Sequence, residues 1–349
     1  MNSEISKKIA NTNIILTLLV VLLHSECLSY FNNTSSYYGV VSTILKFVLS
    51  ICDVAVPTFF SISAYLFFIN YDSSKYISKL KSRIKSLVVP YFCWSTIFLL
   101  FFIVISNMPQ FKMFDGVFIK IEYNLLFIIK SILLSTYDGV LWYVRDLFIL
   151  IIASPIIYFI CKKLGIFNYV LVVLLILLNL YLRIDYYNPV YWLPIYMIAS
   201  YFSINHSDKL VYFASKVSKS RILLLSFMLL FTALLIFYAL NANNYYASYF
   251  YRFYSPVFIY IIILNTNIFN NKLKLAKYSF LLYCSHRWIT IIIKKCLILF
   301  FGLNGLTAIF FQFLTFILTV LLLLIFIKIL ERLSPMVLNI LSGNRLSRE

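Results

Sequence analysis

Residues 306–327 read LTAIFFQFLTFILTVLLLLIFI, a run in which no side chain carries a charge. A helix rises about 1.5 Å per residue, so a run of about 20 apolar residues crosses the ~30 Å hydrocarbon core of a bilayer. Such a helix would have no polar face to present to water. This stretch therefore predicts a transmembrane helix.

The composition extends this interpretation to the whole chain. Of its 349 residues 62% are hydrophobic and 12% charged, with a mean hydropathy of +0.92, whereas soluble domains are about half apolar and about a quarter charged. We predict an all-α, polytopic membrane bundle that forms a single domain, residues 1–349. About ten spans are expected, at residues 13–31, 43–70, 87–106, 141–161, 166–183, 189–204, 221–240, 253–269, 279–301 and 306–330.

Two segments differ from the other apolar runs. The apolar run after Lys7 and Lys8 resembles a secretory signal, but it lacks a small-residue cleavage site, so we expect it to be retained as the first helix. Residues 118–134 are apolar but are interrupted by Lys120, Glu122 and Lys130. This pattern favours an interfacial or re-entrant helix over a further span.

The basic residues orient the predicted bundle. Twenty of the 30 Lys and Arg residues fall in segments on the same side as the N-terminus, and five fall in the opposite loops (Lys112, Lys120, Lys130, Arg183 and Arg252). Cytoplasmic loops carry such an excess. We therefore expect a bacterial plasma-membrane protein with both termini on the cytoplasmic side. The net charge of +18 follows from this bias, so contacts with membrane lipids are expected and nucleic-acid binding is not.

The six cysteines are scattered and show no C-x-x-C spacing, so we expect neither a disulfide framework nor a metal site.

Ionisable residues inside spans mark functional sites more often than other positions do. His24 lies about 16 Å and Asp53 about 15 Å from the ends of their expected spans, so the two side chains can meet near mid-membrane. A carboxylate beside a neutral histidine orients the ring and stabilises the imidazolium, as a general base requires. The alternative is a histidine that only packs against a neighbouring helix. Pro57 is expected to kink the second span.

Arg145 follows Trp142 by three residues at the outer end of the fourth expected span, so both lie on one helical face. An arginine beside a tryptophan at this depth is typical of an interface anchor. The functional alternative is a guanidinium that stabilises an oxyanion, provided that the fourth helix packs against the first.

Six sequence blocks, taken in order, resemble the acyltransferase-3 family of membrane acyltransferases. They are LLVVLLH ending at His24, PTFFSISAYLF from Pro57, RIKSLVVPY from Arg83, LWYVRDLF from Leu141, YSFLLYCSH from Tyr278 and ERLSP from Glu331. The sequence departs from the family pattern at three positions. Asn13 replaces a basic residue eleven positions before the histidine, Ala64 replaces the glycine of Ser-Gly-Tyr, and Ser86 replaces the second arginine of an Arg-x-x-Arg pair.

The resemblance implies transfer of an acyl group, usually acetyl from acetyl-CoA, to a hydroxyl of a cell-surface polysaccharide or lipid-linked glycan. It places His24 at the family's catalytic histidine, and we expect Asp53 or another acceptor to orient this ring. No cofactor is expected to be bound permanently, because the acyl-CoA is the donor substrate.

The donor should dock on the basic cytoplasmic face. Residues 75–85 hold five basic residues, of which Arg83 and Lys85 lie nearest to the membrane. They are our candidates for binding the CoA phosphates, although such residues often serve only as topology signals. Lys7 and Lys8 are candidate substitutes for the basic residue missing at position 13. The remaining candidates for the substrate path are Trp142, Ser63, Tyr65, His286 and Arg287.

Two other classes of protein fit the same sequence. A glycan flippase or exporter also needs many spans with buried charges, and inverted repeats or paired broken helices would favour it. A purely structural partner in an envelope complex would make His24 dispensable. A measurement of acyl-CoA turnover separates these alternatives from an enzyme.

Overall fold

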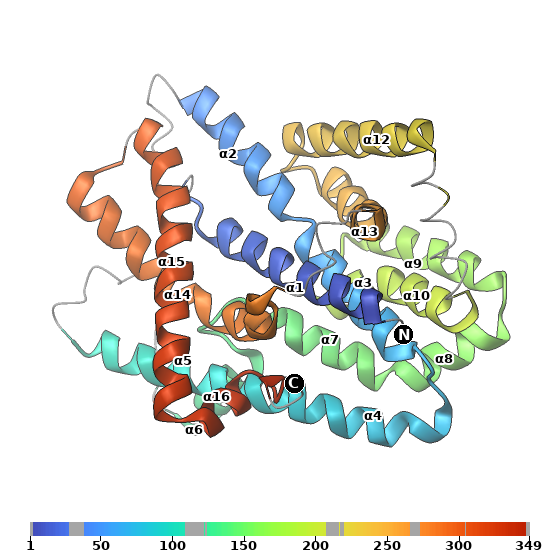
Figure 1. Ribbon diagram of the computed structural model, residues 1–349, viewed down its shortest axis with the longest axis horizontal. Coiled ribbons are helices and arrows are strands. Elements are labelled where there is room, and N and C mark those ends of the chain that lie inside the picture. Colours follow the sequence, from blue (N-terminus) through green and yellow to red (C-terminus); the bar gives the residue numbers. More distant parts are fainter. Residues whose placement is uncertain are drawn as a thin grey trace.

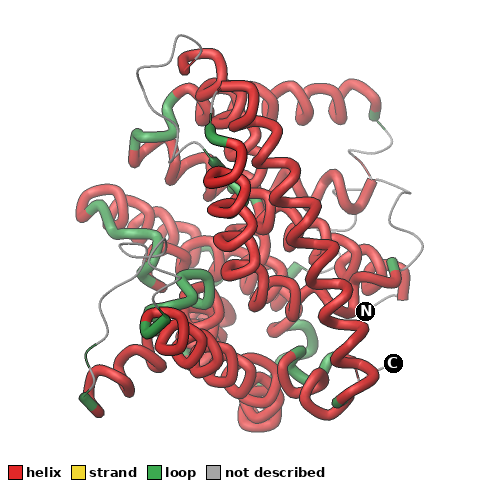
Figure 2. The backbone as a smooth tube through the Cα atoms, turned by 90° about the vertical axis from the view of Figure 1, so that its left-hand side faces the viewer, coloured by secondary structure: helices red, strands yellow, loops and turns green. Residues whose placement is uncertain are grey.

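The computed structural model describes residues 3–27, 38–108, 122, 124–206, 216, 220–265, 273–303 and 305–346. These residues form helices and connecting loops, with no strand among them, which confirms the all-α class (Figures 1 and 2). The end of the first expected span, after Cys27, and the beginning of the expected segment 118–134 lie outside the described residues.

The α-helices follow one another along the described chain. In order they are α1 (Ser3–His24), α2 (Tyr38–Cys52), α3 (Ala55–Phe68), α4 (Tyr76–Arg83), α5 (Val89–Ser106), α6 (Leu125–Leu134), α7 (Trp142–Ile152), α8 (Ser154–Lys163), α9 (Phe167–Leu182), α10 (Pro189–Asn205), α12 (Arg221–Leu240), α13 (Tyr245–Asn265), α14 (Ser279–Phe301), α15 (Gly305–Leu333) and α16 (Pro335–Leu341). Shorter turns are the 3-10 turns η2 (Ser73–Lys75) and η6 (Lys274–Tyr278), and the π-helical turn η3 (Ile84–Val88).

Helix α1 lies at the centre of the bundle. Half of its apolar window is buried, against 11% for α12, which lies along the edge of the molecule in Figure 1. The main neighbours of α1 are α14 and α3, and α14 packs in turn against α15. The hydroxyls of Thr12 and Thr17 donate to the backbone carbonyls of Lys8 and Asn13, so their polarity is satisfied within the helix. Side chains on α1 are therefore surrounded by neighbouring helices.

The predicted kink at Pro57 appears as a break between α2 and α3. A proline ring clashes with the carbonyl four residues earlier and supplies no N–H to it. That earlier residue is Asp53, and residues 53 and 54 are the two that separate the helices. The break therefore follows from the sequence, and it places the Asp53 carboxylate at a helix junction.

Among the described residues, five helical segments are long and apolar enough to cross a membrane, and a sixth is obtained if α7 and α8, which bend by 56° at Ala153, count as one span. They are Lys7–His24, Gly39–Phe68, Ser73–Ser106, Arg221–Leu240 and Thr307–Leu333. Helices α6 and α9 are apolar but shorter. Helix α14 is long, but it carries Arg287, Lys294 and Lys295. The architecture fits a multi-pass membrane protein, while the count of about ten spans and the sidedness stay predictions.

The two ends of the described chain lie in the same half of the molecule. The beginning of α1 and the loop after α16 are both in the lower half of each view (Figures 1 and 2). Helix α16 follows α15 directly and packs against both α15 and α5. The C-terminal segment is therefore part of the bundle.

Candidate active site

His24 is the last residue of α1, not a mid-helix residue as the expected span 13–31 implied. Nη1 of Arg287 on α14 lies 2.9 Å from Nδ1 of His24. Because a guanidinium only donates hydrogen bonds, Nδ1 of His24 must be the acceptor. The neutral ring then carries its proton on Nε2.

His286 lies beside this pair, with its ring centroid 5.2 Å from that of His24. Its Nδ1 is 2.7 Å from the carbonyl oxygen of Tyr283 and 3.2 Å from that of Leu282. Carbonyl oxygens only accept, so Nδ1 of His286 carries the proton, and its buried Nε2 has no hydrogen-bond partner. The two histidines are therefore opposite tautomers in one cluster.

Lys294 contacts the C-terminal end of α1, next to this cluster. Its Nζ donates to the carbonyl oxygens of Glu26, at 2.6 Å, and His24, at 3.3 Å. The last carbonyls of a helix have no partner within the helix, and a cation near them is favourable. Lys294 is itself buried, so this cation contacts the end of α1 from within the bundle.

A cavity of about 250 Å³ opens beside the N-terminal half of α1. It is lined by Asn13, Thr17, Phe59, Ile62, Ser63, Leu66, Arg83, Ser86, Leu87, Tyr143, Leu147, Ser279, Phe280, Tyr283 and Arg345. Among the described residues that line it, the two arginines are the only charged ones, and none is a carboxylate. The cavity therefore favours an anionic ligand.

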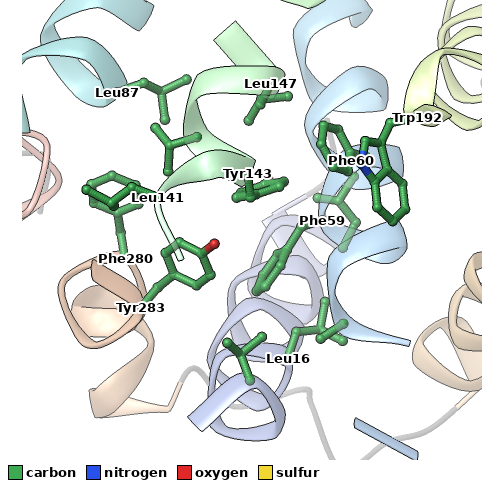
Figure 3. Packing of buried hydrophobic residues seen from close by; sticks show 14 of the residues in the cluster. Leu16, Phe59, Phe60, Leu87, Leu141, Tyr143, Leu147, Trp192, Phe280 and Tyr283 are labelled. Carbon is green, nitrogen blue, oxygen red and sulfur yellow. The ribbon is translucent and has the colours of Figure 1, made fainter. Parts of the chain in front are cut away.

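Three aromatic rings lie at the wall of this cavity. The ring of Phe59 is 5.7 Å from that of Tyr143 and 6.1 Å from that of Tyr283, and the two tyrosine rings are 5.6 Å apart (Figure 3). The Ser63 hydroxyl is 3.3 Å from that of Tyr143. Tyr283 also lies 6.2 Å from the ring of His286. Through Tyr283 the cavity and the histidine cluster are neighbours.

The distance from the cavity to His24 follows from α1 itself. Asn13 and Thr17 line the cavity, and His24 stands eleven and seven residues further along the same helix, which is about 16 Å and about 10 Å at the helical rise. The arginine-lined cavity and the imidazole therefore lie at two levels of one helix.

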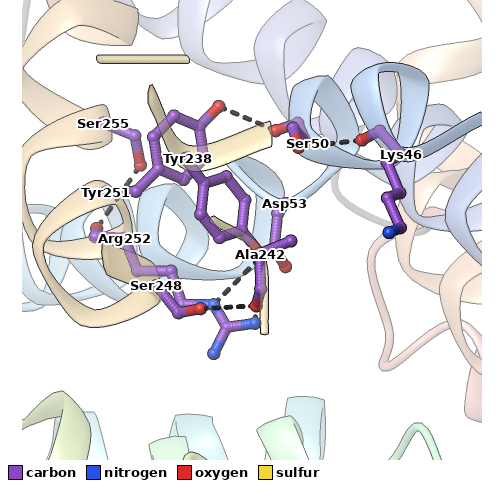
Figure 4. A network of polar contacts seen from close by, with 9 residues as sticks. All are labelled: Lys46, Ser50, Asp53, Tyr238, Ala242, Ser248, Tyr251, Arg252 and Ser255. Atoms are coloured by element: carbon purple, nitrogen blue, oxygen red, sulfur yellow. Dashed lines mark hydrogen bonds and ion pairs between the residues drawn. The ribbon is translucent and has the colours of Figure 1, made fainter. Parts of the chain in front are cut away.

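Asp53 is not paired with His24 as the sequence suggested. Its carboxylate accepts hydrogen bonds from Nε and Nη2 of Arg252, at 3.0 and 2.9 Å, and from the Tyr238 hydroxyl at 2.5 Å (Figure 4). Tyr238 stacks on Tyr251, whose hydroxyl donates to the carbonyl of Ser50. Arg252 was expected in an outer loop but lies inside α13, and this cation takes up the carboxylate.

Arg145 is also held away from His24. Its guanidinium forms a 2.8 Å ion pair with Asp146, and its Nη2 donates to the carbonyl of Tyr187 at 2.8 Å. Trp142 packs beside it against Trp192 and Tyr187. Helix α7 packs mainly against α10 rather than α1. A catalytic role for Arg145 stays a prediction, and neither of these two guanidinium contacts supports it.

Four of the remaining expected residues lie at these two locations, and Lys85 and Tyr65 do not. Arg83 and Ser63 line the cavity, while His286 and Arg287 form the histidine cluster. Lys85 is exposed, and it does not line the cavity. Tyr65 points elsewhere, with its ring 6.5 Å from that of Tyr260 and its carbonyl bonded to Ser203.

Two features of the site were missed in the sequence. Arg345 lines the cavity although it lies near the chain end, where no local pattern marks it. Tyr143 and Tyr283 lie inside two of the six sequence blocks, but nothing in those blocks shows that the two rings meet.

A comparison with protein-family models matches residues 13–328 to an acyltransferase domain, that of acyltransferase family 3. No curated protein matches the chain, and no solved structure matches it either. The match begins at Asn13 in the cavity wall, and it contains His24, Arg83, His286 and Arg287. The chain therefore belongs to the acyltransferase-3 family.

Proposed function

We propose that this membrane acyltransferase transfers an acyl group, in the first instance acetyl from acetyl-CoA, to a hydroxyl of a cell-surface polysaccharide or lipid-linked glycan, with His24 as the general base. The observation that carries this proposal is the arrangement along α1. An arginine-lined cavity lies at one level, and an imidazole bonded to a guanidinium lies about 10–16 Å further on.

The charge of the cavity lining supports an acyl-CoA donor. A coenzyme A thioester carries phosphates at one end and the reacting carbonyl at the end of a long arm. Arg83 and Arg345 supply two guanidinium groups, which match phosphate oxygens well. The aromatic wall of Phe59, Tyr143 and Tyr283 leads from the cavity towards the histidines. The thioester would then lie near His24 while the phosphates stay in the cavity.

A hydroxyl is a poor nucleophile unless a positioned base removes its proton, and such a base contributes typically 10²–10⁴-fold in rate. The lone pair on Nδ1 of His24 is available once the acceptor hydroxyl displaces Arg287 from it. The hydroxyl proton passes to Nδ1 as the new C–O bond forms. When the tetrahedral intermediate collapses, the C–S bond breaks and the thiolate takes the proton back from His24. The reaction therefore needs no external proton.

Arg287 is the nearest cation for the oxyanion in this scheme. It starts 2.9 Å from the nitrogen that receives the proton, so after displacement it remains next to the reacting carbonyl. A donor placed where negative charge develops stabilises the transition state. This assigns to Arg287 the part that the sequence suggested for Arg145.

The experiment compares the wild-type protein with His24→Ala in purified, reconstituted form. We expect the wild type to release CoA from acetyl-CoA and to label a glycan acceptor, and the variant to lose both activities. Membrane insertion should be unchanged, because alanine is cheaper to bury in a bilayer than histidine. An active His24→Ala protein removes the proposed base. A wild-type protein that neither binds nor consumes acyl-CoA favours the glycan flippase or exporter.

A further inference from the structure

The C-terminal segment, residues 335–346, folds back against the start of α5. After α16 the backbone turns at Gly343, with φ of +73°, and Asn344, with φ of +55°. Trp94 donates from its indole nitrogen to the carbonyl of Leu341 at 3.2 Å, and the Asn344 side chain donates to the carbonyl of Lys85 at 3.3 Å. These two bonds fasten the segment to η3 and α5.

Gly343 rests directly on the backbone of Ser86. A Cβ atom at position 343 would overlap the carbonyl oxygen of Ser86, and its positive φ is a conformation that other residues rarely adopt. Ser86 is buried beneath this contact and lines the cavity. The close approach therefore brings the chain to the cavity wall, which Arg345 lines.

Arg345 reaches the cavity two residues later. Its guanidinium carbon lies 4.1 Å from the centroid of the Phe280 ring, and Phe280 is itself a lining residue. A flat guanidinium stacked on an aromatic face is held in place and still presents its N–H groups at its edge. Arg83 contributes the second guanidinium to the same cavity from the end of α4.

We propose that Arg345 and Arg83 together bind the phosphate groups of the acyl-CoA donor, and that residues 335–346 form one wall of the donor site. This inference rests on the proposed function. The wall lies outside the family match, which ends at residue 328. Ser86 stands where the family commonly has the second arginine of a pair, and the C-terminal segment supplies a guanidinium to the same cavity from elsewhere in the chain.

The main experiment measures the Kd of CoA for the full-length protein in nanodiscs of zwitterionic lipid. Arg345→Ala should raise this Kd about tenfold, equivalent to about 1.4 kcal/mol, and Arg345→Lys should raise it less because the charge is kept. Arg332→Ala removes an exposed arginine of α15 that does not line the cavity, and it should leave the Kd unchanged. With saturating acetyl-CoA, Arg345→Ala should retain most of its kcat, since a phosphate contact acts mainly on binding.

Two further probes show what the effect means. Pantetheine carries the thiol arm without the nucleotide phosphates, so its binding should not respond to Arg345→Ala. An equal loss for pantetheine would show damage to the fold and would overturn the phosphate assignment. Gly343→Ala should also weaken CoA binding, because it pushes the segment off Ser86 while leaving Arg345 in the chain. The melting temperature of each variant shows whether the bundle remains folded.

A lipid headgroup is the other source of phosphate at this face. Phosphatidylglycerol in the nanodisc should compete only weakly with CoA for the two arginines. If Arg345→Ala leaves the Kd of CoA unchanged but abolishes a stabilisation by phosphatidylglycerol, the pair binds lipid and the inference is wrong. If the wild type binds no CoA in any nanodisc, the proposed function itself fails. A wild type that binds CoA and an Arg345→Ala variant that binds it equally well refute only the role of Arg345.

Discussion

At the scale of single residues, the position of one proton constrains the chemistry. Nδ1 of His24 accepts a hydrogen bond from Arg287, so in this arrangement the ring is a donor at Nε2 and a base only at Nδ1. In the proposed reaction, the guanidinium and the substrate hydroxyl therefore compete for one lone pair.

This competition predicts different outcomes for two arginines. Arg287→Gln removes the cationic donor beside the reacting carbonyl and should lower kcat by about 10²–10³, as the loss of an oxyanion donor does. Arg145→Lys should change kcat little, because Arg145 is held by Asp146 and Tyr187 away from His24. Steady-state kinetics of both variants at saturating acetyl-CoA tests the assignment. The reverse order of effects would return the oxyanion role to Arg145.

At the scale of elements, an ion pair and a hydrogen bond connect the break between α2 and α3 to α13 and α12. Asp53 at the break bonds to Arg252 in α13 and to Tyr238 in α12, so three segments distant in the sequence meet at one carboxylate (Figure 4). Both charged side chains are mostly buried, at 15% and 17% exposure. Breaking such a pair from one side leaves an uncompensated charge in a poorly hydrated place.

Asp53→Asn should therefore lower stability by about 3 kcal/mol, the low end of the range for a broken buried pair. Thermal unfolding of the detergent-solubilised protein measures the loss. The double variant Asp53→Asn with Arg252→Gln should recover part of it, because no unpaired charge remains. Below its unfolding temperature, Asp53→Asn should keep its kcat. A variant with wild-type stability and low kcat would instead support the role of orienting His24 that the sequence suggested.

At the scale of the whole molecule, we expect the arginine-lined cavity, the proposed donor site, on one side of the predicted membrane. It is lined by Asn13 of α1 and by Arg345, both near the ends of the described chain. The distribution of Lys and Arg predicts that these ends face the cytoplasm. The cell keeps its acyl-CoA on that side, so the charge pattern and the chemistry predict the same orientation.

Sealed vesicles test this orientation directly. Inverted vesicles should bind acetyl-CoA from the medium, and right-side-out vesicles should bind none until they are permeabilised. Raising the salt concentration should weaken the binding, because ionic contacts near a surface are screened over about 8–10 Å at ordinary ionic strength. Binding to intact right-side-out vesicles alone would contradict the predicted topology.

Some properties of this protein are local and can be read from the sequence alone. The apolar runs determine the helices, because a backbone in hydrocarbon must bond within its own segment. Pro57 determines the break four residues earlier for a steric reason. The sequence blocks around His24, Arg83, Tyr278 and His286 indicated the family, and the family match confirmed it.

The partners of these residues were decided only by tertiary structure. His24 carries its own sequence signal, but the choice between Asp53 and Arg287 as its neighbour depends on how α1, α13 and α14 pack. Arg345 belongs to no sequence block, and it enters the cavity because Gly343 fits against Ser86. Both contacts join residues more than 250 positions apart. Local periodicity and hydropathy carry no information about such pairs, because packing between helices is set by the shapes and charges of both surfaces together.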